Sequence, residues 1–344
     1  MNPKTLDLAP GAPRLLEKAP DDLKPYLKPE AYQSMIEIVT PVCQDLWEVE
    51  AFFREKLKQL ETLANKEGLL ILSASLHPFA RAKEQILYED PRYEAIFKEL
   101  KIVGRRFIAQ GLHVHLGMPS EEEALRLYRH LLAYLPLLLA LTTSSPFYEG
   151  ENTGFHSYRT KLFEVLPLAG LPRDFSSWQE YEELLLHLKR YEIIASIRDL
   201  WWDVRIQPAL GTVEIRIYDA PGRLNDLLAV VAFTRVLAER LLETSLSPFP
   251  REIHLYGKWQ AARHGLEGLF VDPQDRRRKF LSEALEELRI LLRPKAEALG
   301  LSGYWEMLHD LLKRRPASYR MLALRETGAT FAEIIAILRE EFWS

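Results

Sequence analysis

The chain has 344 residues, of which 47% are hydrophobic and 27% are charged, so its composition is that of an ordinary globular protein. A formal net charge of −4 argues against a protein that mainly binds nucleic acid or an anionic membrane. Cys43 is the single cysteine, which rules out an intrachain disulfide and fits a reducing compartment. The first residues, Met1–Lys4, lack the features of a signal peptide, and the longest apolar run, Leu131–Leu141, is too short to cross a bilayer and indicates a buried helix. We therefore expect a cytoplasmic protein with no nucleic-acid or membrane partner.

Residues 1–30 are rich in proline and predict an irregular approach to the fold. Beyond them, short strand-like stretches and long helices follow one another irregularly. The predicted strands are Tyr32–Val39, Leu69–Leu76, Gly111–Leu116, Trp201–Gln207 and Thr212–Tyr218. The predicted helices are Gln44–Ala64, a helix from Glu121 with a capping box of Ser120 and Glu123, Ser177–Tyr191 and Leu224–Thr244. From about Arg251 the pattern is helical to the end, with interruptions at Pro273, Pro294, Gly303 and Pro316.

One pair of predicted strands is close in sequence. Trp201–Gln207 and Thr212–Tyr218 are separated by Pro208–Gly211, and that spacing suits an antiparallel hairpin. The other strands do not alternate regularly with helices, and the last third of the chain is helical. We predict an α+β protein with one mainly antiparallel sheet and helices packed on one face. Residues 1–344 are predicted to form a single domain, of which residues 251–344 are a mostly helical extension.

Four predicted strands carry charged or histidine side chains on one face and aliphatic side chains on the other, because residues two apart in a strand share a face. A sheet with one solvated face explains each strand taken singly. Taken together, acidic groups with histidine suit a divalent cation, and arginines suit phosphate or carboxylate oxygens. The strands therefore predict the floor of a cleft for a nucleotide and a metal ion. The polar residues are Glu37; His113 and His115; Asp203 and Arg205; and Thr212, Glu214 and Arg216.

Several common active-site motifs are absent from the sequence. It contains no His-Glu-x-x-His or Cys-x-x-Cys pair, which argues against a zinc hydrolase or a zinc finger. It also lacks Gly-x-Gly-x-x-Gly, the P-loop motif and Gly-x-Ser-x-Gly. If ATP binds, it binds through a sheet without a P-loop, such as that of glutamine synthetase-like enzymes.

Several longer stretches match the pattern of one protein family, in that family's order, and together they span most of residues 5–270. They are Gln33–Cys43, His77–Phe79, Gly111–Gly117, Leu135–Thr160, Trp201–Arg205, Gly211–Arg216 and, more weakly, Trp259–Leu266. On these stretches the sequence resembles the type 2 glutamate–cysteine ligase family, especially its bacterial carboxylate–amine ligase branch. The resemblance implies a glutamine synthetase-like catalytic sheet, binding of ATP with Mg²⁺, and phosphorylation of a carboxylate. An amine then attacks the acyl phosphate to form an amide of the γ-glutamylcysteine kind.

The resemblance also implies roles for individual residues. Metal ions would be held by Glu37, His113 and Glu214, with Glu30 as a further ligand. Arg216 would contact phosphate and, with Glu214, form the catalytic pair, while Arg159 and Arg205 would grip substrate carboxylates. Thr212 and His115, which lie on the same polar faces, complete the predicted substrate and ATP site. The implied partners are an amino-acid carboxylate, an amine and a second copy of the chain in a homodimer.

Other readings of these residues and of the whole protein stay open. Glu37 could be a salt-bridge partner at a strand end, and Arg159 could cap a helix. The amine need not be cysteine. The protein could also be a catalytically silent relative that binds nucleotide or serves as a partner subunit, whereas a generic α+β ligand-binding protein is disfavoured by the length of the matching stretches.

The sequence departs from the family pattern in three places. The family begins with a strand carrying a Gly-Val-Glu-Glu-Glu-type motif whose glutamates bind metal, and Met1–Pro10 resembles the stretch after that strand. Either the start codon is placed too far downstream or the strand is lacking, and its loss would leave a neighbouring strand unpaired. Gly257 stands where asparagine is usual, and Ser75-Leu76 where Gly-Thr is usual.

Overall fold

The computed structural model describes all 344 residues and shows a mixed protein of long helices and short strands. The α-helices are α1 (Ala12–Lys18), α2 (Leu46–Lys66), α3 (Pro91–Gly104), α4 (Glu121–Ala140), α5 (Arg159–Phe163), α6 (Trp178–Arg190), α7 (Leu224–Glu243), α8 (Arg251–His264), α9 (Leu281–Ala298), α10 (Ser302–Arg314), α11 (Ala317–Glu326) and α12 (Phe331–Glu341). The strands are β1 (Leu27–Pro29), β2 (Ile36–Ile38), β3 (Val114–Gly117), β4 (Phe147–Tyr148), β5 (Glu151–Asn152), β6 (Ala169–Gly170), β7 (Trp201–Trp202), β8 (Val204–Gln207), β9 (Thr212–Ile215), β10 (Leu269–Val271) and β11 (Arg278–Phe280).

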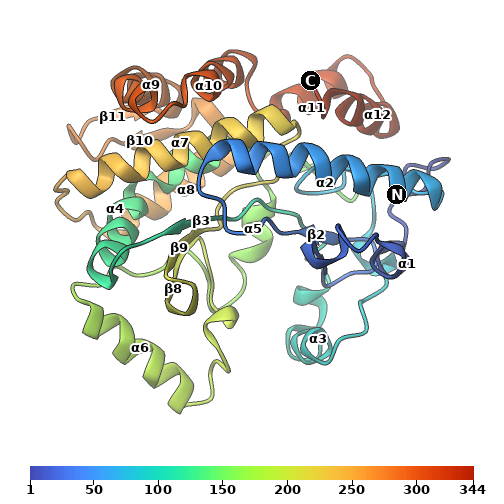
Figure 1. Cartoon of the computed structure of the whole chain (residues 1–344), viewed down its shortest axis with the longest axis horizontal. Coiled ribbons are helices and arrows are strands. Elements are labelled where there is room, and N and C mark those ends of the chain that lie inside the picture. The colour runs from blue at the N-terminus through green and yellow to red at the C-terminus, as the bar shows by residue number, and fades with distance from the viewer.

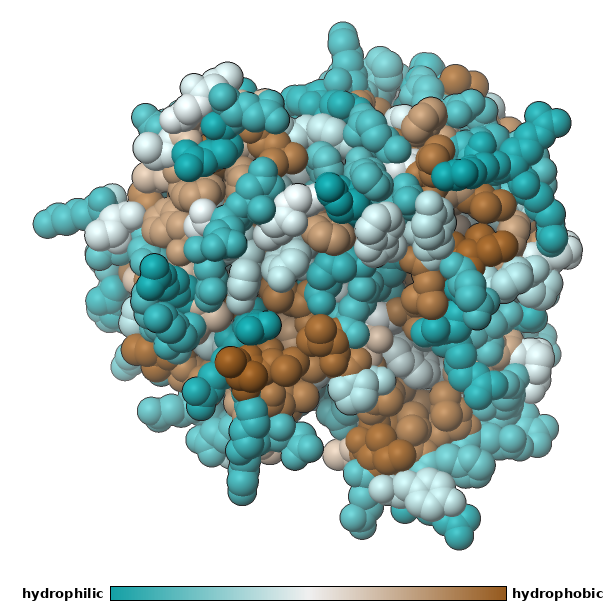
Figure 2. Space-filling view, turned by 180° about the vertical axis from the view of Figure 1, so that it is seen from behind, coloured by the Kyte–Doolittle hydropathy of each residue, from teal (hydrophilic) through white to brown (hydrophobic).

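The helices lie in layers over the strands (Figure 1). Helices α2 and α7 lie side by side across the molecule, with α9 to α12 above them and β3, β9 and β8 below. Helices α3 and α6 project downward at opposite ends. None of the helices is long and apolar enough to cross a membrane. The view from behind shows apolar side chains on both sides of a notch in the lower half of the molecule (Figure 2).

The largest sheet is antiparallel and has the strand order β3-β9-β8. Its register places His115 of β3 and Arg205 of β8 on either side of Glu214 in β9. The predicted hairpin is confirmed, because β8 and β9 pair across the turn Pro208–Leu210. The prediction of one main sheet is wrong, since the remaining strands form four separate two-stranded sheets. Three of these pairs are antiparallel, and β6 with β7 is parallel.

The core lies between this sheet and the helices. Val204, Val213 and Ile215 are each 0% exposed and belong to the same apolar cluster as the buried faces of α4 and α7. The predicted buried helix is confirmed: the apolar run of α4 is buried and continues through Pro136. Ser120 caps this helix by accepting a hydrogen bond from the backbone N–H of Glu123 at 3.2 Å.

Two strand predictions fail because the backbone of each stretch bonds to other partners. The stretch Leu69–Leu76 forms no strand, because its backbone bonds to isolated partners: the Ser75 N–H donates to the Ser144 hydroxyl at 3.2 Å. Only Leu76 makes a single bridge, to Ala109. The stretch Trp201–Gln207 is interrupted at Asp203, where β7 leaves its pairing with β6 and β8 begins.

The C-terminal region also differs from the prediction. A hairpin of β10 and β11 interrupts the helices, and Leu269 begins it by donating its N–H to the side chain of Gln260 at 3.1 Å. Helix α9 does not end at Pro294, although proline removes one helical hydrogen bond. Burial of Leu292 and Ala296, which are 2% and 0% exposed, holds this part of the helix against the core.

Candidate active site

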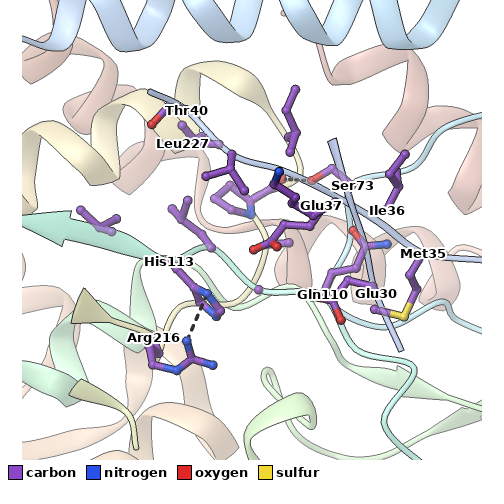
Figure 3. A pocket seen from close by; sticks show the side chains of 18 of the residues that line it. Glu30, Met35, Ile36, Glu37, Thr40, Ser73, Gln110, His113, Arg216 and Leu227 are labelled. Atoms are coloured by element: carbon purple, nitrogen blue, oxygen red, sulfur yellow. Dashed lines mark hydrogen bonds between the residues drawn. The ribbon is translucent and has the colours of Figure 1, made fainter. Parts of the chain in front are cut away.

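A cavity of about 1620 Å³ lies next to β3 and β9 and is also lined by β2. Apolar residues of α2 and α7, among them Leu57 and Val231, close another side. β2 pairs with β1 alone, and β3 is the outer strand of its sheet, so β2 and β3 each have one unpaired edge. Glu37 from β2 and His113, just before β3, lie on facing sides of the cavity, with Arg216 beside His113 (Figure 3). The polar strand residues predicted to share a cleft therefore line one cavity.

Glu214 lies at the centre of the hydrogen bonds that join these residues. Its Oε2 accepts hydrogen bonds from Nε and Nη2 of Arg205 at 3.0 and 2.7 Å and from the Gln207 amide at 2.8 Å. Its Oε1 accepts a hydrogen bond from Arg216. Burial alone would raise the pKa of Glu214, but the guanidiniums of Arg216 and Arg205 hold that pKa well below its usual range. Glu214 is thus an ionised counter-ion for two arginines.

Two histidines complete the surroundings of Glu214. His113 Nδ1 lies 3.8 Å and His115 Nε2 lies 3.6 Å from Glu214 Oε1. Burial is the main cause that lowers the pKa of both rings, so both are neutral at pH 7. The hydroxyl of Thr212 lies 3.0 Å from His115 Nδ1 and fixes the orientation of that ring.

The carboxylates on the β2 side have few partners. Burial, followed by the nearby charge of Glu30, raises the pKa of Glu37, and Arg216 opposes the effect. Glu30 accepts hydrogen bonds from its neighbour's N–H at 3.1 Å and from the Tyr93 hydroxyl at 3.4 Å. Both glutamates line the cavity and offer oxygen atoms of the kind that Mg²⁺ prefers.

The predicted metal ligands do not all converge. No group of three or more histidine, cysteine, aspartate or glutamate side chains is close enough to hold a metal ion. The Glu37 carboxylate accepts no hydrogen bond and that of Glu30 accepts its two through Oε2, so both keep an oxygen that fits a cation. Glu214 does not fit in this arrangement, because arginines and Gln207 already occupy both of its oxygens.

The two other arginines of the cavity, Arg205 and Arg159, differ in how well the protein satisfies their N–H donors. Besides its bonds to Glu214, Arg205 donates through Nη1 to the carbonyls of Ile197 and Leu200 at 2.9 and 2.7 Å. Arg205 therefore supports Glu214, and its predicted contact with a substrate stays a prediction. Arg159 begins α5 and lines the cavity, although its side chain is only 9% exposed. Its Nε is buried and has no hydrogen-bond partner.

A buried lysine was missed by the sequence reasoning. The Nζ of Lys258 lies 2.6 Å from Asp203 and 3.0 Å from Glu164, and its side chain is 2% exposed. Burial alone would lower the pKa of Lys258, but Asp203 and Glu164 raise it, so the residue is charged. Asp203 shares a predicted strand face with Arg205, but its ion pair with Lys258 directs it toward α8 instead. In the sequence, the only feature that could have drawn attention to Lys258 is the weak family match Trp259–Leu266, which begins at the next residue.

A mixed fold with arginines and carboxylates around one cavity places positive charges that suit an anionic ligand beside oxygen atoms that suit a cation. The sequence profile of glutamate–cysteine ligase family 2 (GCS2) matches residues 21–333. A protein of Gloeobacter violaceus provisionally named glutamate–cysteine ligase 2 is 36% identical over 355 residues, which cover 98% of this chain and 93% of the relative. A protein of Bdellovibrio bacteriovorus with the same provisional name is 33% identical over 347 residues, covering 99% and 92%. The chain belongs to glutamate–cysteine ligase family 2, and its enzyme class is that of the ligases.

Two solved structures show a similar fold. A bifunctional glutathione synthetase from Pasteurella multocida superposes with a TM-score of 0.68 at 17% identity, covering 94% of this chain. This chain spans only 48% of that bifunctional protein, about half of its length. A glutamate–cysteine ligase from Francisella tularensis in complex with AMP gives a TM-score of 0.66 at 12% identity, covering 92% of this chain and 82% of that one.

Proposed function

We propose that this protein is an ATP-dependent carboxylate–amine ligase that forms an amide of the γ-glutamylcysteine type through an acyl phosphate. The observation that carries the proposal is the cavity itself, in which Arg216 lies opposite the carboxylate of Glu37 and which Arg159 also lines. Transfer of a γ-phosphate to a carboxylate brings two anions together, so cationic groups on the protein and a metal ion must neutralise them. The AMP in the Francisella tularensis ligase supports a nucleotide at this kind of fold.

The chemistry assigns a task to each side of the cavity. A carboxylate oxygen of the acid attacks the γ-phosphorus, the bond to ADP breaks, and the acyl phosphate forms. The amine then attacks the acyl carbon, loses a proton, and phosphate leaves with the carboxylate oxygen. Arg216 would face the phosphate and Arg159 the acid, while the apolar residues of α2 and α7 would keep water from the intermediate. Glu37 and Glu30 would supply oxygen ligands to Mg²⁺, which when bound neutralises phosphate charge, and the predicted contact of His113 with the metal stays a prediction.

Further parts of the proposal concern the fold and the setting. The β3-β9-β8 sheet is proposed to be the counterpart of a glutamine synthetase-like catalytic sheet. The partners are a small amino-acid carboxylate and an amine, and the protein is proposed to work as a homodimer in the cytoplasm, where ATP and Mg²⁺ are available. Light scattering of the purified chain would measure the mass of the assembly.

The function is tested by following ADP release with Mg-ATP, glutamate and a panel of amines that includes cysteine. We expect ADP release that requires both glutamate and one amine, with the amide as the second product. The absence of amine-dependent ADP release with every amine would refute the ligase proposal.

The second candidate is a catalytically silent relative that binds nucleotide. It is favoured by the state of Glu214, whose oxygens are engaged by Arg205, Arg216 and Gln207 instead of being free for a metal ion. Calorimetric titration with ADP, combined with the turnover assay, separates the two candidates, because both bind nucleotide but the silent relative shows no turnover with any amine.

A further inference from the structure

A buried aspartate lies behind the arginine-lined wall of the cavity. Asp219 is 0% exposed. Its Oδ2 accepts hydrogen bonds from the Ser144 N–H at 2.9 Å and the Ser145 hydroxyl at 2.7 Å, and its Oδ1 accepts one from the Ser157 hydroxyl at 2.9 Å. Burial raises the pKa of Asp219, whereas Arg159 and these three donors oppose that effect. Three donors thus converge on one carboxylate and tie three chain segments together.

This aspartate is connected to both ends of Arg159. The backbone N–H of Arg159 donates to the Ser145 hydroxyl at 3.1 Å, and that hydroxyl in turn donates to Asp219. The guanidinium Nη1 lies 3.9 Å from Asp219 Oδ1. Asp219 therefore fixes where α5 begins and also supplies the nearest opposite charge to the Arg159 side chain.

A glycine forms the other wall of the position that Arg159 occupies. A Cβ atom on Gly111 would lie 2.3 Å from Nη2 and 2.8 Å from Cζ of Arg159, so any side chain there would displace the guanidinium. Gly111 also forms a β-bridge with Asp219. The glycine and the aspartate thus fix the guanidinium from two directions.

The Arg159 guanidinium still has N–H donors that the protein satisfies weakly or not at all. Its two hydrogen bonds, to the carbonyls of Ile217 and Arg216, are both 3.4 Å long, and its Nε is buried without a partner. An arginine carries five N–H donors, and a buried donor without a partner is costly. The neighbouring Arg216 adds a second positive charge. An incoming carboxylate or phosphate oxygen would satisfy the charge and the weakly bonded Nη donors.

We propose that Asp219 is a positioning residue that, through Ser145 and with Gly111, holds the Arg159 guanidinium in the pose that binds an anionic group of the substrates. The inference rests on the proposed function for the identity of those substrates. The anionic group is the carboxylate of the acid or a phosphate of the nucleotide, and measuring the two ligands separately distinguishes them.

The test compares Asp219→Asn and Ser145→Ala with a matched control, Asp226→Asn. Asp226 is also buried and paired with an arginine, Arg314, but lies on α7 and is not among the cavity-lining residues. For each full-length variant, the dissociation constants of glutamate and of ADP are measured by calorimetry, the unfolding temperature by scanning calorimetry, and KM and kcat where turnover occurs.

We expect Asp219→Asn to weaken one of the two ligands about tenfold or more and to leave the other within about twofold, with KM for the affected substrate rising more than kcat falls. Weaker glutamate would assign Arg159 to the carboxylate, and weaker ADP would assign it to phosphate. Asp226→Asn should lower the unfolding temperature and leave both constants unchanged. Unchanged affinity for both ligands in Asp219→Asn would overturn the inference.

Two further results keep this inference separate from the ligase proposal. If Asp219→Asn does not fold, Gly111→Ala displaces the guanidinium while leaving the aspartate and its serines in place, and the same loss of one ligand is expected. If no variant and no wild-type chain turns over, the ligase proposal fails, but a selective loss of anion binding still supports the positioning role.

Discussion

Glu214 and Glu37 are two glutamates on strands that line the same cavity, yet their surroundings are opposite. Glu214 is 2% exposed, and three cationic or amide side chains hold its carboxylate. Glu37 is half-buried, and only burial and nearby charges act on its pKa. The pKa of Glu214 is held far below its usual range, and that of Glu37 is raised.

The difference separates the side of the cavity around Glu214, which is held together by ion pairs, from the side around Glu37, whose carboxylate can bind a cation. A buried carboxylate between arginines stabilises the fold only while all partners are present, because removing one leaves uncompensated charge. A partly desolvated carboxylate without hydrogen bonds destabilises its ionised form and gains from a cation. The β3-β9-β8 sheet therefore provides the fixed geometry, and β2 provides the free ligand oxygens.

The largest expected effect is that of Glu214→Gln. The substitution removes the charge that Arg205 and Arg216 share, so we expect the free energy of unfolding to fall by about 3 kcal/mol. Chemical denaturation measures the change, and Glu182→Gln, on the exposed face of α6, is the control with no expected effect. A Glu214→Gln protein as stable as the wild type would mean that this side of the cavity is not held by its ion pairs.

The second effect is a loss of stability at acidic pH that comes from His156. It has to be known before the stabilities of Glu214 and Glu37 variants are compared at different pH values. Burial, together with the charges of Arg315 and Arg263, lowers the pKa of His156 to about 4, below the usual value of 6.5. Between these values the unfolded chain binds a proton that the folded chain does not, so stability falls as the pH drops below 6.5. At pH 5 this histidine alone should cost about 2 kcal/mol relative to pH 7.

The measurement is the free energy of unfolding of His156→Asn at pH 7 and pH 5. An asparagine at this position can keep the contact of the ring with the Ser318 hydroxyl, which is 2.8 Å away, but it cannot take up a proton. The loss of stability between the two pH values should shrink by about 2 kcal/mol, whereas His187→Asn on exposed α6 should leave it unchanged. An identical loss in His156→Asn and the wild type would contradict the assignment.

The smallest expected effect on stability, and opposite in sign, is that of Glu37→Gln. Because the pKa of Glu37 is raised, its ionised form costs stability above that pKa, and the neutral amide removes this cost. We expect the free energy of unfolding at pH 7 to rise by up to about 1 kcal/mol and the gain to vanish at pH 4. The Mg²⁺ concentration needed for half-maximal turnover should rise about tenfold, and a clear loss of stability at pH 7 would place Glu37 with the supporting residues instead.

The sequence predicts the polar faces of the central sheet well. Alternation along the sequence from Thr212 places Glu214, in β9, and Arg216, just after it, on the polar side, and the observed register sets His115 and Arg205 beside Glu214. Local periodicity is sufficient here, because the side-chain period of a strand does not depend on distant contacts. The buried helix α4 is likewise predicted by a local signal, its long apolar run.

The rest depends on contacts between distant parts of the chain. Asp219 bonds to Ser144, Ser145 and Ser157, which are 62 to 75 residues away, and no local pattern marks such a group. The loss of the predicted strand Leu69–Leu76 has the same origin, since Ser75 and Ser144 are 69 residues apart. Whether a glutamate is free, like Glu37, or saturated, like Glu214, is likewise decided by tertiary packing.

The most direct test of the proposed acyl-phosphate ligase reaction follows oxygen atoms from the substrate carboxylate to the products. Glutamate labelled with ¹⁸O in its side-chain carboxylate is incubated with the protein, Mg-ATP and the amine that supports ADP release. An acyl phosphate transfers one carboxylate oxygen to the departing phosphate, so we predict inorganic phosphate that carries one ¹⁸O per amide formed. Label in AMP, or amide formation with unlabelled phosphate, would contradict an acyl-phosphate ligase.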